Sequence, residues 1–484
     1  MNILDTQRPF HFLGIGGAGM SALAEVLLHR GYDVSGCDLR HSAATAQLES
    51  LGVRVAEGHD AEHLDPAAAV VVSAAIPPDN RELVTARERG QTIVHRADLL
   101  AAVMAGARGI AVAGTHGKST TTTMVGAVLE AAGWDPTVIV GGQIRGQAGN
   151  VRLGAPRGDG GGWIVAEADE FNRSFLALAP DHAVITNIEA DHLDTYGSLE
   201  AVREAFAAFA AAVPPGGTLA LGIDDAGVRA LAVPPGRARV TFGFDTAADV
   251  RATDVRSRRR ETDFALILAG EAAGETQLAL PGRHNVLNAL GAAAIAYALQ
   301  IGPAEIRAGL AAVQGVGRRF DLVHRDEGVL IVDDYAHHPT EIAATLAAAR
   351  AGWPERRLVA VFQPHLYSRT RDFADAFGSA LATADRVIVT DVYPAREQPL
   401  PGVTGELVVA AARRAGARDV TYWPELAAEG APAIRKLDAG LEPGDLVVTL
   451  GAGDVDGVAK RLAAWRGSRS DTMGGRSSDA RDGD

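Results

Sequence analysis

The chain has 484 residues, of which 47% are hydrophobic and 22% charged, and its formal net charge is −14 at pH 7. This length predicts about three domains with enough apolar residues to fill their cores. The acidic balance argues against a nucleic-acid partner or an anionic membrane surface. Cys37 is the one cysteine, which excludes an internal disulfide and fits a reducing compartment.

No apolar stretch reaches membrane-spanning length, and the segment 1–10 lacks the apolar core of a signal peptide. We therefore expect a cytoplasmic protein with no membrane span. The sequence is compatible with a monomer or a homodimer.

Strand and helix signals alternate along almost the whole chain, which predicts an α/β fold with largely parallel sheets. The first predicted domain covers residues 1–106. Its expected strands are 10–13, 33–37, 69–73 and 92–95, and its expected helices are 18–30 and 97–105.

A glycine-rich turn, Gly14-Ile15-Gly16-Gly17-Ala18-Gly19, follows the first expected strand. Together with Asp38 after the next strand, it matches a dinucleotide fingerprint and by itself favours an NAD-dependent enzyme. A UDP group would satisfy the same physical demands, because it also needs a close backbone approach and a helix N-terminus beside its diphosphate. Ser73 and the pair His95-Arg96 lie at the ends of further strands, where open α/β sheets bind ligands. For His95 alone, a capping or core role is the simpler interpretation.

The second predicted domain, residues 107–315, opens with a strand at 109–113 and the sequence Gly114-Thr115-His116-Gly117-Lys118-Ser119-Thr120. A buried strand, a glycine turn and a helix over 118–132 together form a phosphate cradle. Lys118 supplies a charge for the outer phosphates, and Ser119 offers a hydroxyl group to Mg²⁺. One glycine of the full GxxxxGK[ST] pattern is absent, so the match rests on GxxGK[ST]. The motif predicts an enzyme that uses ATP.

Acidic residues follow two more strands of this domain, 163–166 and 183–186. Glu167-Ala168-Asp169-Glu170 comes after the first, and Asn187-Ile188-Glu189-Ala190-Asp191-His192 after the second. Carboxylates at a sheet end beside a phosphate loop are typical ligands of Mg²⁺, whereas most surface charge runs are merely solvated. A strand at 218–223 and a peripheral β section at 238–268 follow. The helix 285–299 begins at His284-Asn285, and these side chains with Asn288 either cap the helix or bind an adenine edge.

A hinge at Gly315-Val316-Gly317 separates the third predicted domain, residues 316–466, which has expected strands at 329–332, 358–362, 387–389 and 446–450. Two polar segments follow strands there, Asp333–Thr340 and Phe362–Arg371. Arg369 and Arg371 suit a carboxylate or phosphate, whereas adjacent histidines such as His337 and His338 point to different sides and rarely share a metal. Residues 467–484 have no apolar periodicity, and we expect a disordered tail.

These motifs together resemble the Mur ligase family, and within it the branch that adds alanine. The resemblance runs from about Phe10 to Leu462 and rests on eight segments in the family's order: GIGGAGMS, GTHGKST, EADE, TNIEADHLDTY, GRHNVLNAL, DDYAHHPTE, FQPHLYSRT and LGAGD. It implies a Rossmann-like domain for a UDP-sugar, a central P-loop ATPase domain, and a Rossmann-like C-terminal domain for an amino acid.

The implied reaction is the ATP-dependent coupling of L-alanine to the lactyl carboxylate of UDP-N-acetylmuramate, in peptidoglycan precursor synthesis. It proceeds through an acyl phosphate, releases ADP and phosphate, and uses ATP and two Mg²⁺ sites. Phosphoryl transfer of this kind needs alignment and charge neutralisation more than a covalent catalyst.

The resemblance also implies roles for individual residues. The catalytic residues would be Lys118, His192, His338, His365 and Arg369. The ATP-binding residues would be Gly114, Thr115, His116, Gly117, Lys118, Ser119, Thr120, His284, Asn285, Asn288, Arg319, Asp334 and His337. The substrates would be held by Gly16, Gly17, Gly19, Met20, Asp38, Ser73, His95, Arg96, Tyr335, His365, Arg369 and Arg371. The metal ligands would be Ser119, Glu167 and His192.

The chain departs from the family pattern at three places. Ser119 replaces a usual Thr, Phe171-Asn172-Arg173 follows EADE where Ser-Asp-Ala is common, and Leu366 stands where Arg is frequent. Three rival functions stay open: a ligase that adds a recycled tripeptide to the same UDP-sugar, an NAD-dependent oxidoreductase, and a nucleotide-gated binding protein without ligase chemistry.

Overall fold

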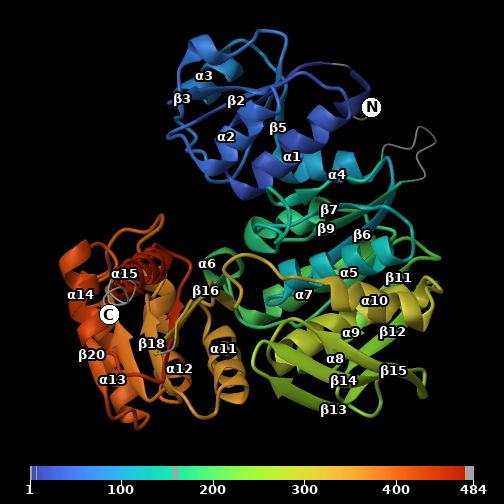
Figure 1. The fold of residues 1–484 in the computed structure, drawn as a ribbon. Coiled ribbons are helices and arrows are strands. Elements are labelled where there is room, and N and C mark those ends of the chain that lie inside the picture. Colours follow the sequence, from blue (N-terminus) through green and yellow to red (C-terminus); the bar gives the residue numbers. More distant parts are fainter. Residues whose placement is uncertain (1–2, 7, 156–161, 327, 475–484) are drawn as a thin grey trace, which may run out of the picture. The chain divides into compact units, whose positions relative to one another are not determined.

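The computed structural model describes residues 3–6, 8–155, 162–326 and 328–474, and it contains three β-sheets flanked by helices (Figure 1). The chain forms two compact units: the first holds the N-terminal sheet and most of the central one, and the second holds the C-terminal sheet. The predicted α/β class is confirmed. The sequence also predicts a glycine-rich loop at 158–162, before the strand 163–166; it lies outside the described residues except for Gly162.

The N-terminal sheet has five parallel strands in the order β3-β2-β1-β4-β5. They are β1 (Phe10–Leu13), β2 (Val34–Asp38), β3 (Arg54–Glu57), β4 (Ala69–Val72) and β5 (Ile93–His95). Successive side chains of a strand point to opposite faces, so Phe10 and Phe12 join the core under α1 (Ala18–His29) and α4 (Arg96–Met104). Leu13 joins the smaller core under α3 (Arg81–Glu88). The chain leaves β1 on one side toward β2 and returns on the other at β4, and such a switch point is where α/β sheets bind ligands.

The central sheet has ten strands in the order β15-β14-β13-β12-β11-β10-β6-β9-β7-β8. Its strands are β6 (Arg108–Ala113), β7 (Thr137–Ile139), β8 (Val151–Arg152), β9 (Trp163–Glu167), β10 (His182–Ile185), β11 (Thr218–Gly222), β12 (Ala238–Gly243), β13 (Val250–Arg258), β14 (Glu261–Leu268) and β15 (Glu271–Leu278). The strands β9 and β10 flank β6 and run parallel to it. The segments that follow these three strands therefore meet at one edge of the sheet.

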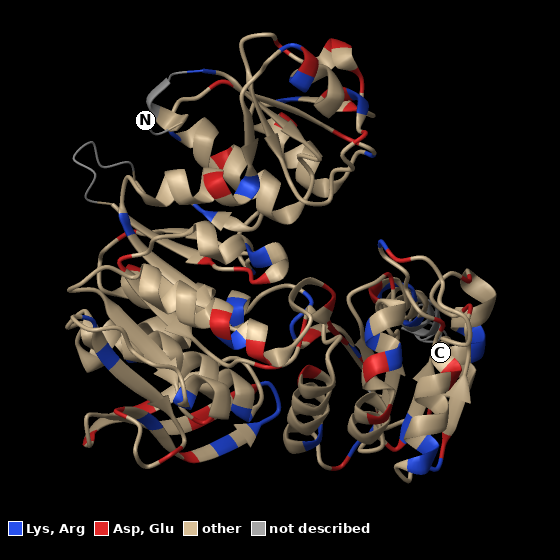
Figure 2. Cartoon of the chain, turned by 180° about the vertical axis from the view of Figure 1, so that it is seen from behind, with Lys and Arg blue, Asp and Glu red and all other residues tan. Residues whose placement is uncertain are grey.

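Helices of the central region are α5 (Lys118–Ala131), α6 (Leu193–Tyr196), α7 (Leu199–Ala212), α8 (Ala226–Arg229), α9 (Arg283–Ala298) and α10 (Pro303–Ala312). The strand β6 is apolar and buried over Gly109–Ala113, as expected for a strand covered on both faces. The predicted peripheral β section is real and continues to Leu278; Figure 2 shows charged residues along its strands.

The C-terminal sheet has six strands in the order β16-β17-β21-β18-β19-β20, with β16 antiparallel at the edge. Its strands are β16 (Asp321–Arg325), β17 (Leu330–Asp334), β18 (Arg357–Phe362), β19 (Arg386–Val389), β20 (Val420–Tyr422) and β21 (Asp445–Leu450). One face packs on α11 (Pro339–Gly352), α12 (Tyr367–Leu381) and α13 (Gly405–Arg414). The other face packs on α14 (Ala431–Ala439) and α15 (Asp456–Gly474).

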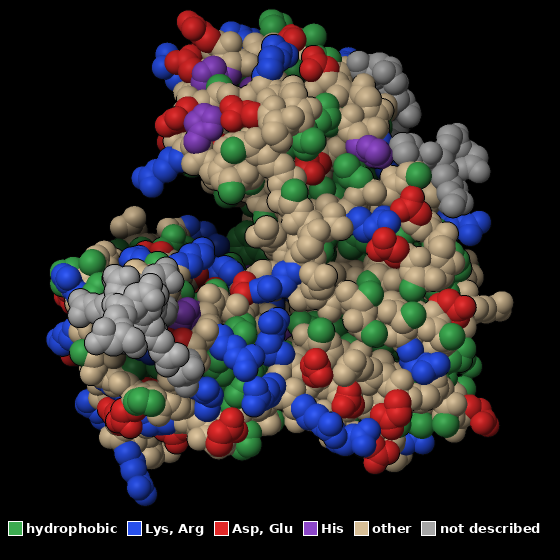
Figure 3. All heavy atoms as spheres, in the orientation of Figure 1, with side chains coloured by type: hydrophobic (Ala, Val, Ile, Leu, Met, Phe, Trp, Pro, Cys, Tyr) green, Lys and Arg blue, Asp and Glu red, His purple; other side chains and the backbone are tan. Residues whose placement is uncertain are grey.

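The C-terminal segment differs from its prediction. The helix α15 continues to Gly474, so residues 467–474 are helical rather than disordered, and residues 475–484 lie outside the described part. No helix of the described part is both long and apolar enough to cross a membrane. On the face seen in Figure 3, hydrophobic side chains are scattered rather than gathered in one broad patch.

Candidate active site

The phosphate loop lies between β6 and α5, at the carboxyl end of the central strand. Gly114 and Gly117 have φ angles of +142° and +82°, which L-residues with side chains rarely adopt. A Cβ atom on Gly114 would lie 1.9 Å from Oγ1 of Thr186, and one on Gly117 would lie 2.3 Å from Oδ1 of Asn288. Both positions therefore require glycine for conformation and for space.

Asn187 holds the loop from the neighbouring strand. Its Oδ1 accepts a hydrogen bond from the His116 N–H at 2.8 Å, and its Nδ2 donates to the His116 carbonyl at 3.1 Å. The hydroxyl of Thr186 donates to the same carbonyl at 2.6 Å. These bonds explain why an irregular loop keeps one shape.

Lys118 begins α5, and its ammonium group is enclosed by oxygen atoms. Its Nζ donates to the carbonyls of Gly114 and Thr115 at 2.8 and 3.1 Å and lies 2.7 Å from Oε2 of Glu170. Burial lowers the pKa of Lys118, but the charges of Glu170, Asp169 and Glu167 outweigh burial and raise it. The lysine stays protonated in this acidic surround, as a phosphate-binding cation must.

Ser119 and Glu167 form the oxygen pair expected of a magnesium site. Oγ of Ser119 donates to Oε2 of Glu167 at 2.8 Å, and the Gly141 N–H donates to the same oxygen at 2.7 Å. Mg²⁺ takes oxygen ligands and usually keeps several waters beside one or two protein groups. The donor set fits that ion, and Ser119 comes one residue after Lys118.

A second cluster of metal-binding groups lies next to Lys118. Ligand atoms of Asp169, Glu170 and His192 all lie within 4.8 Å of one another. His192 adopts a left-handed backbone conformation with φ of +52°, and its Nε2 is 3.8 Å from Oε1 of Glu170. Burial raises the pKa of Glu170 to about 7, although Lys118 opposes this effect. The predicted metal residues are thus divided, with Glu167 beside Ser119 and His192 beside Glu170.

The N-terminal sheet contributes a second glycine loop, after β1. The Gly16 N–H donates to Oδ2 of Asp38 at 2.8 Å, so this carboxylate is held against the loop. Nη2 of Arg96, at the start of α4, lies 3.9 Å from Oδ2 of Asp169, which follows β9. A cavity of about 190 Å³ is lined by Gly19 and Arg96 on one side and by Gly141 and Glu167 on the other.

The predicted base-binding side chains gather at the start of α9. Nδ2 of Asn288 donates to Oδ1 of Asn285 at 3.2 Å, and both residues are buried. Asn288 also approaches Gly117 of the phosphate loop. Side-chain amides therefore lie beside the loop, and their partial charges are available to a nucleotide held there.

In the second unit, the segment after β17 carries Asp334, Tyr335 and His337. Asp334 accepts hydrogen bonds from the N–H groups of Phe320 and Ala336, each at 2.8 Å. Burial raises the pKa of Asp334 to about 6, against the opposing charge of Arg319 and these N–H groups. The guanidinium carbon of Arg319 lies 5.3 Å from the centroid of the Tyr335 ring. Its Nη1 lies 3.3 Å from Oε1 of Glu341.

The adjacent histidines point to different sides, as predicted. The ring of His338 packs against Phe373 with centroids 5.1 Å apart, whereas the ring of His337 lies 5.9 Å from that of His365. Glu341 holds both backbones, since its carboxylate accepts from the N–H groups of His337 and His338 at 3.0 and 3.3 Å.

The segment after β18 brings only some of its predicted residues together. Nη1 of Arg369, which is buried, lies 3.4 Å from Nδ1 of His365. Arg371 instead pairs with the neighbouring Asp372 at 2.7 Å and is more than half exposed. Leu366 is buried and precedes α12 with φ of +68°. It contributes packing and a turn, and provides no contact for an anion.

Comparison with known proteins gives the family. Residues 9–108 match a model described as Mur ligase family, catalytic domain; residues 112–296 match Mur ligase middle domain; and residues 318–453 match Mur ligase, glutamate ligase domain. A curated UDP-N-acetylmuramate–L-alanine ligase from Geobacter sp. (strain M21) is 48% identical over 453 residues, covering 93% of this chain and 96% of the relative. The chain belongs to the Mur ligase family.

Two solved structures resemble this Mur ligase along nearly its whole length. The UDP-N-acetylmuramate-alanine ligase of Thermotoga maritima has a TM-score of 0.79 at 30% identity, covering 96% of this chain and all of that one. A murein peptide ligase from Psychrobacter arcticus 273-4 has a TM-score of 0.69 at 26% identity, covering 94% and 98% of the two chains. An alanine ligase and a murein peptide ligase are thus both among the similar structures.

Three residues of this Mur ligase that contact candidate site residues were not assigned individual roles from the sequence. Glu170 is the fourth residue of the quoted EADE segment and pairs with Lys118. Asn187 opens the quoted segment after β10 and holds His116. Glu341 ends the quoted DDYAHHPTE segment and binds Arg319. In each case the sequence shows a polar residue at a strand end or in a first helical turn. It does not show which side chain or backbone group that residue contacts.

Proposed function

We propose that this chain is an ATP-dependent ligase that couples L-alanine to the lactyl carboxylate of UDP-N-acetylmuramate and releases ADP and phosphate. The observation that carries the proposal is the 48% identity to a UDP-N-acetylmuramate–L-alanine ligase over 453 residues. The phosphate loop supports it, because Lys118 and Ser119 begin a helix at the end of a central strand. The three domains would be 1–106 for the UDP-sugar, 107–315 for ATP and 316–466 for the amino acid.

In this mechanism Lys118 and the loop N–H groups hold the β- and γ-phosphates while the lactyl carboxylate attacks the γ-phosphate. Such a site lowers the barrier mainly by stabilising the negative charge on the transferred phosphoryl group. Ser119 and Glu167 would hold one Mg²⁺, and His192 with the neighbouring carboxylates would help to hold a second. Mg²⁺ supplies neutralisation of phosphate charge when bound.

The carboxylate substrate has a fitting position in the first unit. The cavity between Gly19 and Gly141 is flanked by the cation of Arg96 and lies beside Glu167. A carboxylate there would be close to the phosphate loop and would gain from the arginine charge. The ion pair of Arg96 with Asp169 is long, at 3.9 Å, so the guanidinium is able to turn to a substrate.

L-alanine would meet the acyl phosphate with residues of the second unit. The pair His365 and Arg369 offers a buried guanidinium for a carboxylate or the tetrahedral intermediate. Arg319, Asp334 and His337 would contact ATP, while Tyr335 and His338 would contact the substrates. Arg371 is a weaker candidate, since Asp372 already neutralises it.

The test is product analysis. The purified protein is given UDP-N-acetylmuramate, ATP, Mg²⁺ and a mixture of L-alanine, L-serine and glycine, and the product is identified by mass spectrometry. We expect the alanine adduct and one phosphate released per adduct. In a separate reaction, the tripeptide L-alanyl-γ-D-glutamyl-meso-diaminopimelate replaces the amino acids; phosphate release with this peptide but not with L-alanine would overturn the assignment of substrate.

The same assay separates the other rival functions. A binding protein without ligase chemistry would hydrolyse ATP and give no amide product. An oxidoreductase would bind NADH tightly and ignore the UDP-sugar. We also propose a cytoplasmic location, and the oligomeric state stays a prediction of monomer or homodimer.

A further inference from the structure

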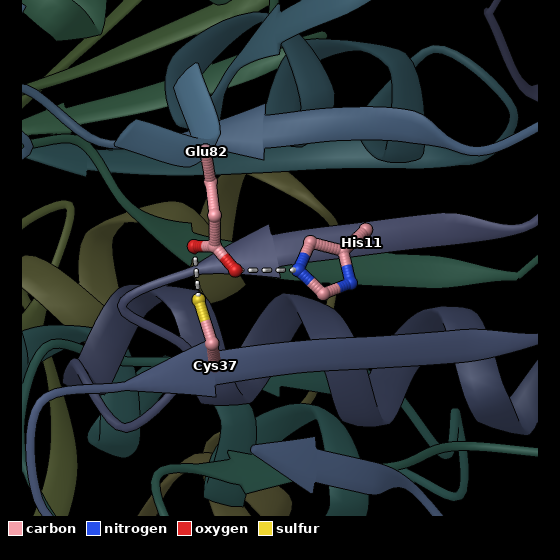
Figure 4. A group of neighbouring side chains, drawn as sticks. All are labelled: His11, Cys37 and Glu82. Carbon is pink, nitrogen blue, oxygen red and sulfur yellow. Dashed lines mark hydrogen bonds and ion pairs between the residues drawn. The ribbon is translucent and has the colours of Figure 1, made fainter. Parts of the chain in front are cut away.

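A polar cluster is buried on the face of the N-terminal sheet that α3 covers, apart from the residues assigned to the ligase reaction. His11, Cys37 and Glu82 come from β1, β2 and α3, and their exposed fractions are 1%, 0% and 0%. Figure 4 shows the Glu82 carboxylate between Cys37 and His11. An ionisable group in such a place requires close polar partners.

The distances around Glu82 form a tight triangle. Its Oε2 atom is 2.8 Å from Sγ of Cys37 and 2.8 Å from Nδ1 of His59, and these two atoms are 3.1 Å apart. On the other carboxylate oxygen, Oε1 is 2.9 Å from Nδ1 of His63 and 3.8 Å from Nε2 of His11. One carboxylate thus faces a thiol and three imidazoles.

Hydrogen bonds explain only part of this cluster. Thiol and imidazole protons can be donated to the carboxylate. Burial would raise the pKa of Glu82, but its interactions with His11, Cys37 and His59 outweigh burial and lower it to about 2. Nε2 of His11, however, has no hydrogen-bond partner among the described residues, since 3.8 Å is too long. Its Nδ1 is bonded to the Ser35 hydroxyl at 2.9 Å, so the unpartnered nitrogen faces the cluster.

We propose that this cluster is a Zn²⁺ site, with Cys37 Sγ, His59 Nδ1, the Glu82 carboxylate and His11 Nε2 as its ligands. Sulfur, imidazole and carboxylate are the groups that bind zinc in proteins, and a four-coordinate site with bonds of about 2.0–2.3 Å separates its ligand atoms by about 3.3–3.6 Å. The triangle of Cys37, His59 and Glu82 has to open by about 0.2–0.8 Å to accept the ion. His11 Nε2, which lies within 4.8 Å of the ligand atoms of Cys37 and Glu82, has to move inward to complete the site.

Binding would exchange protons for metal. The Cys37 thiol loses its proton to solvent and becomes a thiolate ligand, whereas His59 binds through Nδ1 as a neutral imidazole that carries its proton on Nε2. Burial and the adjacent Glu82 raise the pKa of Cys37, so protons compete with zinc and affinity increases with pH. His63 serves as a positioning residue, because its ring lies beside Oε1 of Glu82 and orients that carboxylate.

The position of the cluster provides a route for the ion from solvent and links it to the glycine loop after β1. The side chains of His59 and His63 are 14% and 25% exposed, so the segment around η2 (Ala61–His63) is the entrance. The Cys37 carbonyl accepts hydrogen bonds from the N–H groups of Gly14 and Ile15, each at 2.9 Å. A metal on Cys37 would therefore stiffen the glycine loop after β1.

The test uses Co²⁺ as a spectroscopic substitute for zinc on the full-length protein after treatment with a chelator. Because Cys37 is the one cysteine, a thiolate-to-cobalt charge-transfer band in the near ultraviolet reports this site and cannot arise at the carboxylates of the phosphate loop. We expect the band to saturate at one equivalent and to disappear when zinc is added. Zinc should also raise the melting temperature of the wild-type protein.

Variants make the assignment specific. Cys37→Ser should abolish the band and the thermal shift, His59→Gln should weaken cobalt binding at least tenfold, and His41→Gln should change neither. His41 is a matched control because it is an exposed histidine of the same domain, 3.6 Å from Glu49. If Cys37→Ser does not fold, His59→Gln, whose side chain is partly exposed, decides. A folded wild-type protein without the band at stoichiometric cobalt, or a His59→Gln variant with unchanged affinity, would overturn the proposal.

Discussion

Lys118 and Glu170 form a buried ion pair at the place where a nucleotide phosphate would bind. Their charges lie 2.7 Å apart, and the exposed fractions of the two side chains are only 13% and 3%. Phosphate oxygens would therefore compete with Glu170 for the same ammonium group. A carboxylate whose pKa burial has raised to about 7 is a partner that can give up the lysine at low cost, since protonation neutralises it.

Replacing Lys118 should separate catalysis from substrate binding. For Lys118→Ala we expect kcat/KM to fall by about 10²–10⁴, which corresponds to about 3–5 kcal/mol of lost transition-state stabilisation. The affinity for UDP-N-acetylmuramate, measured by calorimetry, should stay within about twofold, because its proposed loop follows β1. Undiminished ligation would contradict the role of Lys118.

Two controls accompany this variant. Lys460→Ala removes another of the three lysines, one that is 67% exposed and paired with Asp456, and it should leave activity unchanged. The double variant Lys118→Ala/Glu170→Gln removes the buried charge that the single variant strands. It should recover stability and remain inactive, which shows that the lost activity is not a folding defect.

Asp334 should give the second unit a characteristic pH dependence. Its pKa in the folded protein is about 6, above the ordinary 3.8, because burial disfavours the carboxylate. Between these values the unfolded chain ionises more readily than the folded one, so stability falls as pH rises from about 4 to 6 and levels off above. The difference in unfolding free energy between wild type and Asp334→Asn should shrink by on the order of 2 kcal/mol over that range.

Urea titrations at pH 4, 5, 6 and 7 measure this difference. Taking the difference between wild type and variant cancels the contributions of all other titrating groups, because only residue 334 differs. A difference that is constant with pH, or that grows between pH 4 and 6, would show that the carboxylate ionises at least as easily inside the protein as outside it.

The positions of candidate site residues were predictable where a backbone pattern determines them, and were not predictable where a side chain can turn toward several partners. Gly117 and Lys118 follow from strand, turn and helix alone. Arg371 was grouped with Arg369 from guanidinium chemistry and from the family resemblance, but residues two apart point to different sides of a helix, and Arg371 pairs with Asp372. The buried cluster at Glu82 joins four segments of chain, and no local pattern reports such a meeting.

At the scale of elements, the turn into α5 depends on Gly117 for two separate reasons. Its φ of +82° costs any L-residue about 1 kcal/mol, and its Cβ would collide with Asn288. Gly133, which ends the same helix, has a φ of +78°, but a Cβ atom added there would meet no other group within 4 Å among the described residues. A side chain would strain the backbone at both positions, but it would collide with a neighbour only at Gly117.

This pair makes a matched experiment. Gly133→Ala should lower the free energy of unfolding by about 1 kcal/mol and leave the affinity for ATP unchanged. Gly117→Ala should lose the same stability and in addition weaken ATP binding at least tenfold, because the loop must move from Asn288. Equal nucleotide affinities in the two variants, measured by calorimetry with Mg²⁺, would show that the loop tolerates the displacement.

The helices and strands that were predicted correctly are those with long apolar segments in the sequence. Strand β6 and helix α1 were predicted within one or two residues, because buried periodic segments and a following glycine mark them. Helix α2 (Ala43–Ser50) was missed; it is short, and two of its residues, Thr45 and Leu48, are buried. Edge strands β3 and β16 were also missed, since neither contains a fully buried residue and their pairing depends on the sheet they join.

At the scale of the whole molecule, the proposed nucleotide contacts are divided between the two units. Lys118 and Ser119 belong to the first unit, whereas Arg319, Asp334 and His337 belong to the second. One bound ATP can touch both sets only if the units come together around it. Such closure would also keep water from the acyl phosphate, whose hydrolysis would waste the ATP.

Closure predicts a smaller molecule in solution when the ligands are bound. With UDP-N-acetylmuramate, Mg²⁺ and a non-hydrolysable ATP analogue, the radius of gyration from small-angle X-ray scattering should decrease relative to the ligand-free protein. Lys118→Ala should show a weaker decrease at the same concentrations, because the nucleotide loses its main cation in the first unit and bridges the units less often. Superimposable curves with and without ligands, at concentrations where calorimetry shows both ligands bound, would contradict closure. In that case the residues of the second unit would have to act on the reaction without contacting the nucleotide.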